Sequence, residues 1–450
     1  MNEQKQYDGT LLVGPDEKLP FAESIFLGLQ HLLAMDIYVV PFIIAGILSL
    51  SLSDSAFLIQ ATFIACGIST LLQARFLMRL PVAQGPSYVP IASIVGIALA
   101  AGGGITGLGT AFGAILIGGI ITTVLGFSSI IRKGINYFVP PLVGGTIIFV
   151  VGLSLMPVGL KENIFTVHGP GTIGENIVLA FISGGVLTLC VMLGIRLGRK
   201  GNWLRIGSVV LALIAGCIAA ASMGRFSLDA VIAAPWFSMP RIAFVSFPVV
   251  FDISAIITMM IIYLVLLAET TGTWFAVSSV IEQPLSDKQL DRGIIGEGLG
   301  CFIGGLFGGT PVTGYSTNAG LISITGVASR HAFYGCAFWM ILFGLSNKLA
   351  TLIASIPAPV IGGVFVIVCS IIALSGFRII RHLPLTERNM FIIGIPIIVT
   401  LALFLLPQDY VATLPEFLRY ILNSTIASAA LVAIVLNKVL PQEINLYNEK

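Results

Sequence analysis

The chain has 450 residues, of which 56% are hydrophobic and only 10% are charged, and its mean hydropathy is +1.01. Because soluble domains carry about 25% charged residues, this composition excludes an ordinary soluble protein and predicts an all-α polytopic membrane protein. The net charge of +2 does not indicate a nucleic-acid partner.

Cysteines and histidines do not form a recognisable site in the sequence. All six cysteines lie in or beside apolar runs, and the chain has no CxxC pair. We therefore expect buried free thiols, without a disulfide framework, a metal site or a cofactor. Residues 1–20 lack the basic and then apolar pattern of a cleaved signal, so the first span is expected to direct the chain to the membrane.

Apolar runs of about 20 residues predict fourteen membrane spans. In chain order they lie near 23–50, 55–74, 82–100, 107–128, 136–156, 174–195, 203–222, 250–279, 292–307, 310–328, 332–354, 358–377, 389–407 and 419–439. The polar stretches between these spans are too short to form a separate soluble domain.

Lysines and arginines are distributed unevenly between the two sides of this arrangement. Loops after even-numbered spans hold fourteen of them, loops after odd-numbered spans hold five, and the two tails hold four. The positive-inside bias therefore predicts that both termini are cytoplasmic. The expected location is the cell membrane, and the short tails favour a bacterial inner membrane.

Spans 3 and 10 are short, are interrupted by Gly and Pro, and begin alike, with PVAQGPSY at 81–88 and PVTGYSTN at 311–318. Moving 81–98 by 230 residues onto 311–328 aligns six identical residues without a gap. PPLVGGTIIFVV in span 5 also matches APVIGGVFVIVC in span 12, at an offset of 218. Short apolar segments match by chance, but two matches in the same order favour a true repeat.

Each half then contains seven spans, an odd number, so the two halves must lie upside down relative to each other. Inverted repeats with paired broken helices are typical of secondary transporters, whose binding site lies where the broken segments meet. The predicted parts are a cytoplasmic tail (1–22), a first repeat (23–222), an extracytoplasmic connection (223–249), a second repeat (250–439) and a cytoplasmic tail (440–450).

Four carboxylates lie in or beside the spans, and an ionised group at membrane depth costs about 2.5–3.5 kcal/mol, so each needs a partner or a function. Glu269 lies among threonines in LLAETTGTWF. It either accepts N–H donors from a polar, uncharged ligand, together with a proton, or is a buried acid satisfied by backbone and Thr. Glu297 lies among glycines and is either a proton carrier or a structural strut. Asp36 is equally open to a structural role, and Asp252 is expected to be solvated.

The broken segments contribute uncharged polar side chains. Tyr88 offers an aromatic face and Gln84 a bidentate amide to a ligand, although either could fill the core. Thr317 and Asn318 occupy the mirrored places in the second broken segment. His31, near the start of span 1, is more typical of a hydrogen-bonded packing residue than of a ligand.

The segment GGTPVTGYSTNAGLISITGVASR at 308–330 resembles the signature of the nucleobase–ascorbate transporters, the nucleobase:cation symporter family of xanthine and uracil permeases. Asn318, Gly320, Thr325 and Gly326 fit that pattern. QHLLAM, AQGPSY and AETTG in spans 1, 3 and 8 are similar to further family segments, and the resemblance covers essentially the whole chain.

The resemblance implies two inverted repeats of seven spans, a core domain that moves against a gate domain (spans 5–7 and 12–14), and a homodimer. It also implies short strands in spans 3 and 10 that hold a nucleobase between them. Glu269 is then the principal ligand, Tyr88 stacks on the ring, and Glu297 matches a position tied to proton coupling. The implied substrate-binding set is Glu269, Tyr88, Ser87, Gln84, Thr273, Tyr315, Ser316, Thr317 and Asn318, and the proton-coupling set is Glu297, Glu269 and His31.

We therefore predict a transporter, not an enzyme, that imports an oxidised purine (xanthine or urate) by proton symport. Gly326 resembles the xanthine and urate types. Thr317 and Thr273 stand where the family usually has Glu or Gln and His or Asp, so the site carries fewer charged groups than usual. Uracil or another nucleobase is the alternative within the family. An anion exchanger or channel of the sulfate/bicarbonate type is the rival from another class, and Glu269 argues against it because an anion site should avoid a carboxylate.

Overall fold

The computed structural model describes residues 11–167, 171–315, 317–407 and 425–441, together with 410, 411, 413–415, 418 and 422. Within these residues seven helices are long and apolar enough to cross a membrane, or eight if one sharply bent pair counts as a single span. The expectation of a multi-span, mostly helical membrane protein is therefore confirmed. Much of the last predicted span before residue 425, and both ends of the chain, lie outside the described residues.

The first half of the chain forms most of its helices in the predicted places. Its elements are α1 (Phe21–Leu33), α2 (Val39–Ile47), α3 (Leu52–Leu71), the π-helical turn η1 (Leu72–Phe76), β1 (Gln84–Pro86), α4 (Ile91–Ala100), α5 (Gly104–Gly126), α6 (Ile130–Phe138), α7 (Pro141–Pro157), the π-helical η2 (Val158–Phe165), α8 (Ile173–Arg196), the short η3 (Gly198–Gly201), α9 (Asn202–Ile206), α10 (Ser208–Ser222) and α11 (Asp229–Ala233).

The second half repeats the pattern of long helices around a short strand. Its elements are α12 (Ile253–Val280), α13 (Asp287–Phe307), β2 (Val312–Gly314), α14 (Thr317–Thr325), α15 (Arg330–Leu345), α16 (Asn347–Ala354), α17 (Ala358–Ile380), α18 (Glu387–Leu405) and α21 (Thr425–Val439).

Two spans that the sequence predicted as continuous are interrupted. The first breaks between α1 and α2, at residues 34–38, where Asp36 lies. The span predicted near 332–354 bends by 78° between α15 and α16. There the Ser346 hydroxyl accepts a hydrogen bond from the backbone N–H of Leu349, so Ser346 caps a new helix instead of continuing the old one. Apolar run length alone does not reveal such breaks, because a few polar residues, Asp36 at the first and Ser346 to Lys348 at the second, do not end the apolar run.

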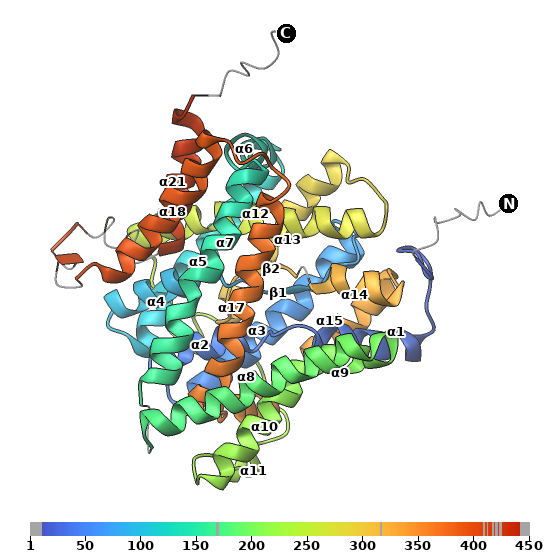
Figure 1. Cartoon of the computed structure of the whole chain (residues 1–450), viewed down its shortest axis with the longest axis vertical. Helices are drawn as coiled ribbons and strands as arrows, with labels where there is room; N and C mark the ends of the chain where they lie inside the picture. The colour runs from blue at the N-terminus through green and yellow to red at the C-terminus, as the bar shows by residue number, and fades with distance from the viewer. Residues whose placement is uncertain are drawn as a thin grey trace.

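Strands β1 and β2 pair with each other as a two-stranded antiparallel sheet near the centre of the molecule (Figure 1). The register places Gln84 opposite Gly314, and the N–H of Tyr315 donates to the carbonyl of Ala83. Threonines from flanking helices complete the pattern: Thr70 of α3 accepts from the N–H of Gln84 at 2.8 Å, and Thr270 of α12 accepts from the N–H of Gly314 at 2.9 Å. Backbone that leaves the helix at membrane depth thus keeps its hydrogen bonds.

The helices pack as two groups. One group surrounds the strands and contains α1, α3, α4, α5, α12, α13 and α15. In the other, α7, α8, α10, α17, α18 and α21 pack mainly on one another, and α7 and α17 run side by side (Figure 1). The contacts between the groups are fewer and involve chiefly α2, α12 and α21.

Residues 11–20 precede the first helix and fold back onto the end of α14. Val13 forms a bridge with Val327, and the Ser329 hydroxyl donates to the carbonyl of Glu17 at 2.6 Å. The described part of the predicted N-terminal tail is therefore held against the end of α14 by backbone and side-chain hydrogen bonds.

Helices α1 and α15 cross closely because glycines meet at their contact. A Cβ atom on Gly335 would lie 2.1 Å from the carbonyl oxygen of Ser24, and one on Gly28 would lie 2.3 Å from the backbone N of Cys336. Both clashes involve backbone, so a side chain at either position forces the helices apart.

We expect Gly335→Ala to destabilise the protein by about 1–3 kcal/mol, because overpacking of a rigid contact costs that much. The measurement is the temperature of thermal unfolding of the purified protein in detergent. Gly46→Ala on α2 is the matched control, since a Cβ there meets nothing within 4 Å. Equal unfolding temperatures for the Gly335 variant and the wild type would contradict the close α1–α15 crossing.

Candidate functional site

The candidate site lies where β1, β2 and the middle of α12 meet. Glu269 on α12 accepts a hydrogen bond from the Ser87 hydroxyl at 2.8 Å, which joins α12 to the residue just after β1. Glu269 is partly exposed, although Leu266, Leu267 and Thr270 around it are buried. One turn further along α12, a Cβ atom on Gly272 would meet nothing within 4 Å. The hydrogen-bonded pair of Ser87 and Glu269 is therefore only partly buried.

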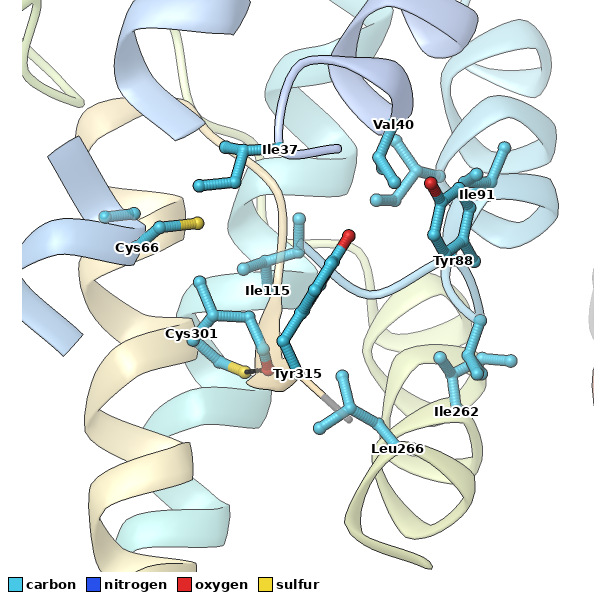
Figure 2. Close-up of a cluster of buried hydrophobic side chains, with 14 of the residues drawn as sticks. Ile37, Val40, Cys66, Tyr88, Ile91, Ile115, Ile262, Leu266, Cys301 and Tyr315 are labelled. Carbon is cyan, nitrogen blue, oxygen red and sulfur yellow. Dashed lines mark hydrogen bonds between the residues drawn. The ribbon is translucent and has the colours of Figure 1, made fainter. Parts of the chain in front are cut away.

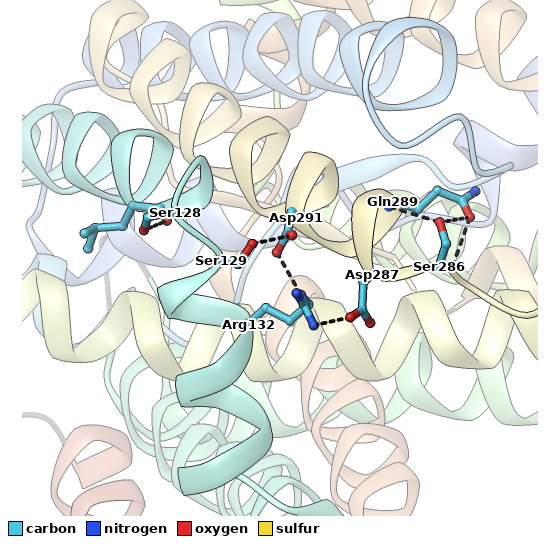
Figure 3. A network of polar contacts seen from close by, with 8 residues as sticks. Ser128, Ser129, Arg132, Ser286, Asp287, Gln289 and Asp291 are labelled. Carbon is cyan, nitrogen blue, oxygen red and sulfur yellow. Dashed lines mark hydrogen bonds and ion pairs between the residues drawn. The ribbon is translucent and has the colours of Figure 1, made fainter.

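No ion pair among the described residues involves Glu269. The ion pairs lie at the ends of helices, and the most extensive connects α6 with the start of α13 (Figure 3). There Arg132 contacts Asp287 at 2.7 Å and Asp291 at 2.9 Å, and its hydrogen bond to Asp291 raises the pKa of the guanidinium. Among the described residues Glu269 thus has no cation beside it, and its side-chain partner is the Ser87 hydroxyl.

Tyr88 and Tyr315 lie at the ends of the two strands, and both rings approach α12 (Figure 2). The Tyr88 hydroxyl donates to the carboxylate of Asp36 in the α1–α2 break, and its ring stacks on Phe365 of α17 with centroids 5.9 Å apart. The Tyr315 ring lies directly on Gly85, where a Cβ atom would be 2.3 Å from the ring. Only glycine at position 85 lets this ring reach the strand.

Gln84 has an unusual environment. Its side chain is fully buried, yet neither its amide nitrogen nor its amide oxygen has a hydrogen-bond partner among the described residues. Buried amides are almost always satisfied, by protein, water or ligand. The position of Gln84, paired with Gly314 where the strands cross, makes it a candidate to bind a polar ligand in the way the sequence predicted.

Asn318 and His31 form a buried pair. Oδ1 of Asn318 accepts from Nδ1 of His31 at 3.1 Å, so His31 carries its proton on Nδ1. The Asn318 amide nitrogen is 3.5 Å from the carbonyl of Ala83, just before β1. The His31 ring packs on Phe333 with centroids 4.3 Å apart. Asn318 therefore links α14 to α1 and to the residue before β1. His31 is a hydrogen-bonded and packed side chain in this arrangement.

The remaining predicted ligands differ in their surroundings. Thr317 begins α14 and is exposed. Thr273 is buried, and its methyl group lies 3.4 Å from where a Cβ on Gly314 would be, so it packs against β2. Ser316 lies outside the described residues. Asp252, which was expected to be solvated, is the N-cap of α12 and accepts from the N–H of Ala255 at 2.7 Å.

Glu297 on α13 is 1% exposed. The Gln73 amide nitrogen lies 3.5 Å from its carboxylate and also donates to the carbonyl of Gly293 at 2.8 Å. Glu297 is close enough to Glu269 for their charges to interact. Two carboxylates without a basic partner among the described residues therefore share the interior beside β2.

The sequence analysis missed Gln73 and Phe365. A glutamine inside the apolar run of span 2 was a usable signal for Gln73, because polar side chains within membrane helices are costly. Phe365 lies in an apolar run and carried no such signal.

Comparison with known proteins gives one consistent result. The Permease family model Xan_ur_permease matches residues 22–408. The uric acid transporter UacT of Escherichia coli is 33% identical, covering 94% of this chain and 87% of that protein. The xanthine permease XanP of the same organism is 30% identical, covering 95% and 94%. The solved transmembrane domain of a cyanobacterial bicarbonate transporter, BicA, has the same fold, with a TM-score of 0.60 and 16% identity over 87% of this chain and 98% of that one.

Two substitutions of His31 test two properties separately: its hydrogen bond to Asn318 and its ability to take up a proton. His31→Phe leaves the Asn318 oxygen buried without a donor, which costs about 1–3 kcal/mol, so we expect its unfolding temperature to fall. His31→Gln keeps a side-chain N–H and is expected to unfold like the wild type and to keep the pH dependence of uptake.

The measurements are thermal unfolding of the purified variants and uptake across a range of pH. Normal unfolding with lost pH dependence in His31→Gln would contradict a purely structural role and support the predicted role of His31 in proton coupling.

Proposed function

Because this chain belongs to the nucleobase–ascorbate transporter family of xanthine and uracil permeases, we propose that it imports an oxidised purine, xanthine or urate, by proton symport. The homologues identify it as a membrane transporter of nucleobases and not as an enzyme. The observation that carries the more specific proposal is the Glu269 carboxylate, partly buried and without a cation among the described residues, beside two interrupted spans.

The geometry suits a flat molecule with several N–H groups. Glu269 accepts N–H donors from one edge of the base, and the unpartnered amide of Gln84 offers both a donor and an acceptor. Tyr88 supplies a ring for stacking. Oxidised purines present N–H and C=O groups around the ring and so match this mixed set better than an apolar ligand would.

Proton coupling follows from the energetic cost of the two neighbouring carboxylates. An ionised group at membrane depth costs about 2.5–3.5 kcal/mol on insertion scales. A proton bound together with the base removes one charge from the pair Glu269 and Glu297 while the site changes access. Coupling requires that proton and base favour the same occupied state. We assign base binding to Glu269 and proton transfer to Glu297.

The architecture we propose is fourteen spans in two inverted repeats of seven. The strand register supports it: Gln84 pairs with Gly314, and these residues are 230 positions apart, the same offset as the sequence repeat. Two segments that pair across a twofold axis run antiparallel, with equivalent positions paired at the axis and the other pairs displaced symmetrically, as Gly85 with Thr313 and Pro86 with Val312 are. The two helix groups correspond to the predicted core and gate domains, whose relative movement would alternate access to the site.

The contact of residues 11–20 with the end of α14 supports the predicted topology. Val13 lies beside Val327, so the N-terminal segment is on the same side as the end of span 10, which the basic residues place in the cytoplasm. We also propose that both termini are cytoplasmic and that the protein lies in the cell membrane, with the domain boundaries predicted from the sequence. A homodimer is part of the proposal by family membership.

The anion-exchanger alternative is not favoured. The likeness to BicA concerns the fold alone, at 16% identity. The Glu269 carboxylate can only accept hydrogen bonds when ionised, and an inorganic anion offers it no N–H donor, whereas a purine does.

We expect Glu269→Gln to lower the uptake of labelled xanthine or urate by about 10- to 100-fold, because a hydrogen bond to a charged group contributes about 1.5–3 kcal/mol. The assay is uptake of xanthine, urate, guanine and uracil into membrane vesicles, with and without a proton gradient. Asp229→Asn, an exposed carboxylate on the extracytoplasmic connection, is the control. Unchanged uptake and unchanged pH dependence in Glu269→Gln would refute the assignment of Glu269.

Glu297→Gln should uncouple transport from the proton gradient. Exchange of internal for external base needs no net proton movement, so we expect exchange to continue while accumulation driven by the gradient is lost. Both are measured in proteoliposomes with labelled base. Accumulation at the wild-type level in the variant would contradict a proton role for Glu297.

A further inference from the structure

Asp36 is a third carboxylate in the interior that the proposed mechanism does not use. It lies in the break between α1 and α2 and is partly exposed, although its neighbours Met35 and Ile37 are buried. No ion pair among the described residues includes it. The titratable groups that face it are Tyr88, Tyr315 of the second strand segment, Tyr38 of its own segment and Cys369 of α17. Among the described side chains, its one hydrogen-bond partner with a measured contact is the Tyr88 hydroxyl.

The principal contact of Asp36 is the hydrogen bond that its carboxylate accepts from the Tyr88 hydroxyl. A hydrogen bond to an ionised acceptor is about twice as strong as one between neutral groups. It therefore controls where the Tyr88 ring points. Without it, the ring keeps only its packing contacts, chief among them the stacking on Phe365.

The other contact of Tyr88 is with the second helix group. Its ring stacks on Phe365 of α17 at 5.9 Å, and Cys369, one turn further along α17, also faces Asp36. α2, which follows Asp36 directly, packs on α17 as well. Tyr88 thus lies at the boundary between the two groups, held on one side by Asp36 and on the other by Phe365.

We propose that Asp36 is a positioning residue for substrate recognition: its carboxylate fixes the Tyr88 hydroxyl and so keeps the Tyr88 ring at the site when α17 moves relative to the strands. The proposal rests on the proposed function, because it assigns Tyr88 to the base. It explains why the first span is broken at residues 34–38. An unbroken helix would keep those residues on the helical path, whereas the break lets Asp36 turn towards Tyr88.

The test compares Asp36→Asn, Tyr88→Phe and the double variant in uptake of labelled xanthine and urate by proteoliposomes. Asn keeps an acceptor but loses the charge, and Phe keeps the ring but loses the hydroxyl. We expect each single variant to raise KM by about tenfold and to change the maximal rate by less than about twofold. The double variant should be no worse than either single one, because both remove the same interaction.

Asp229→Asn is the matched control and should leave KM unchanged. An unchanged KM in Asp36→Asn or Tyr88→Phe, additive effects in the double variant, or a loss confined to the maximal rate would each overturn the role of Asp36. If Asp36→Asn does not fold, as judged by thermal unfolding, a wild-type KM in Tyr88→Phe still overturns it.

Glu269→Gln, measured in parallel, separates the two proposals. Loss of uptake in Glu269→Gln with wild-type KM in the Asp36 and Tyr88 variants would overturn the role of Asp36 and leave the proposed function standing. If the wild-type protein takes up neither base, both proposals fail.

Discussion

Two segments of backbone leave the helical path in the interior of a membrane protein, and their hydrogen bonds must be made there without water. β1 and β2 satisfy each other across the antiparallel pair, and the threonine hydroxyls of Thr70 and Thr270 accept from N–H groups that would otherwise have no partner. Once the backbone is satisfied in this way, the side chains at the strand ends are available for other contacts. Gln84, Ser87 and Tyr315 all owe their positions to this pairing.

The same arrangement explains why acids collect around the strands. Glu269 is bonded to Ser87, Glu297 lies near Gln73, and Asp36 is bonded to Tyr88. Each carboxylate has hydroxyl or amide partners and no cation among the described residues. Hydroxyl and amide partners offset only part of the energetic cost of a buried carboxylate charge. Binding of a ligand with several N–H groups, or of a proton, lowers that cost further. This is the physical ground on which we propose proton symport.

Local sequence patterns predicted much of this. The Gly- and Pro-broken starts of spans 3 and 10 indicated where helices fail, and Glu269 stood out as an acid within an apolar run. The pairing of Asp36 with Tyr88 was not predictable, because the two residues are 52 positions apart and no local sequence pattern indicates a contact between them. The same holds for Gln73 and Glu297, which are 224 positions apart. The bend between α15 and α16 was missed because the predicted span ran across Ser346, Asn347 and Lys348, although three polar residues headed by a serine are a usable helix-cap signal.

The central claim is that a planar base lies between the strand ends and the Glu269 carboxylate. The most direct measurement is an experimental structure of the purified protein determined with saturating xanthine or urate. The account predicts density for a flat ring within hydrogen-bonding distance of Glu269, next to Tyr88 and within reach of the Gln84 amide. Density for the base in the outer cavity of about 330 Å³ beside Arg241 and Gln60, with the strand site empty, would contradict it.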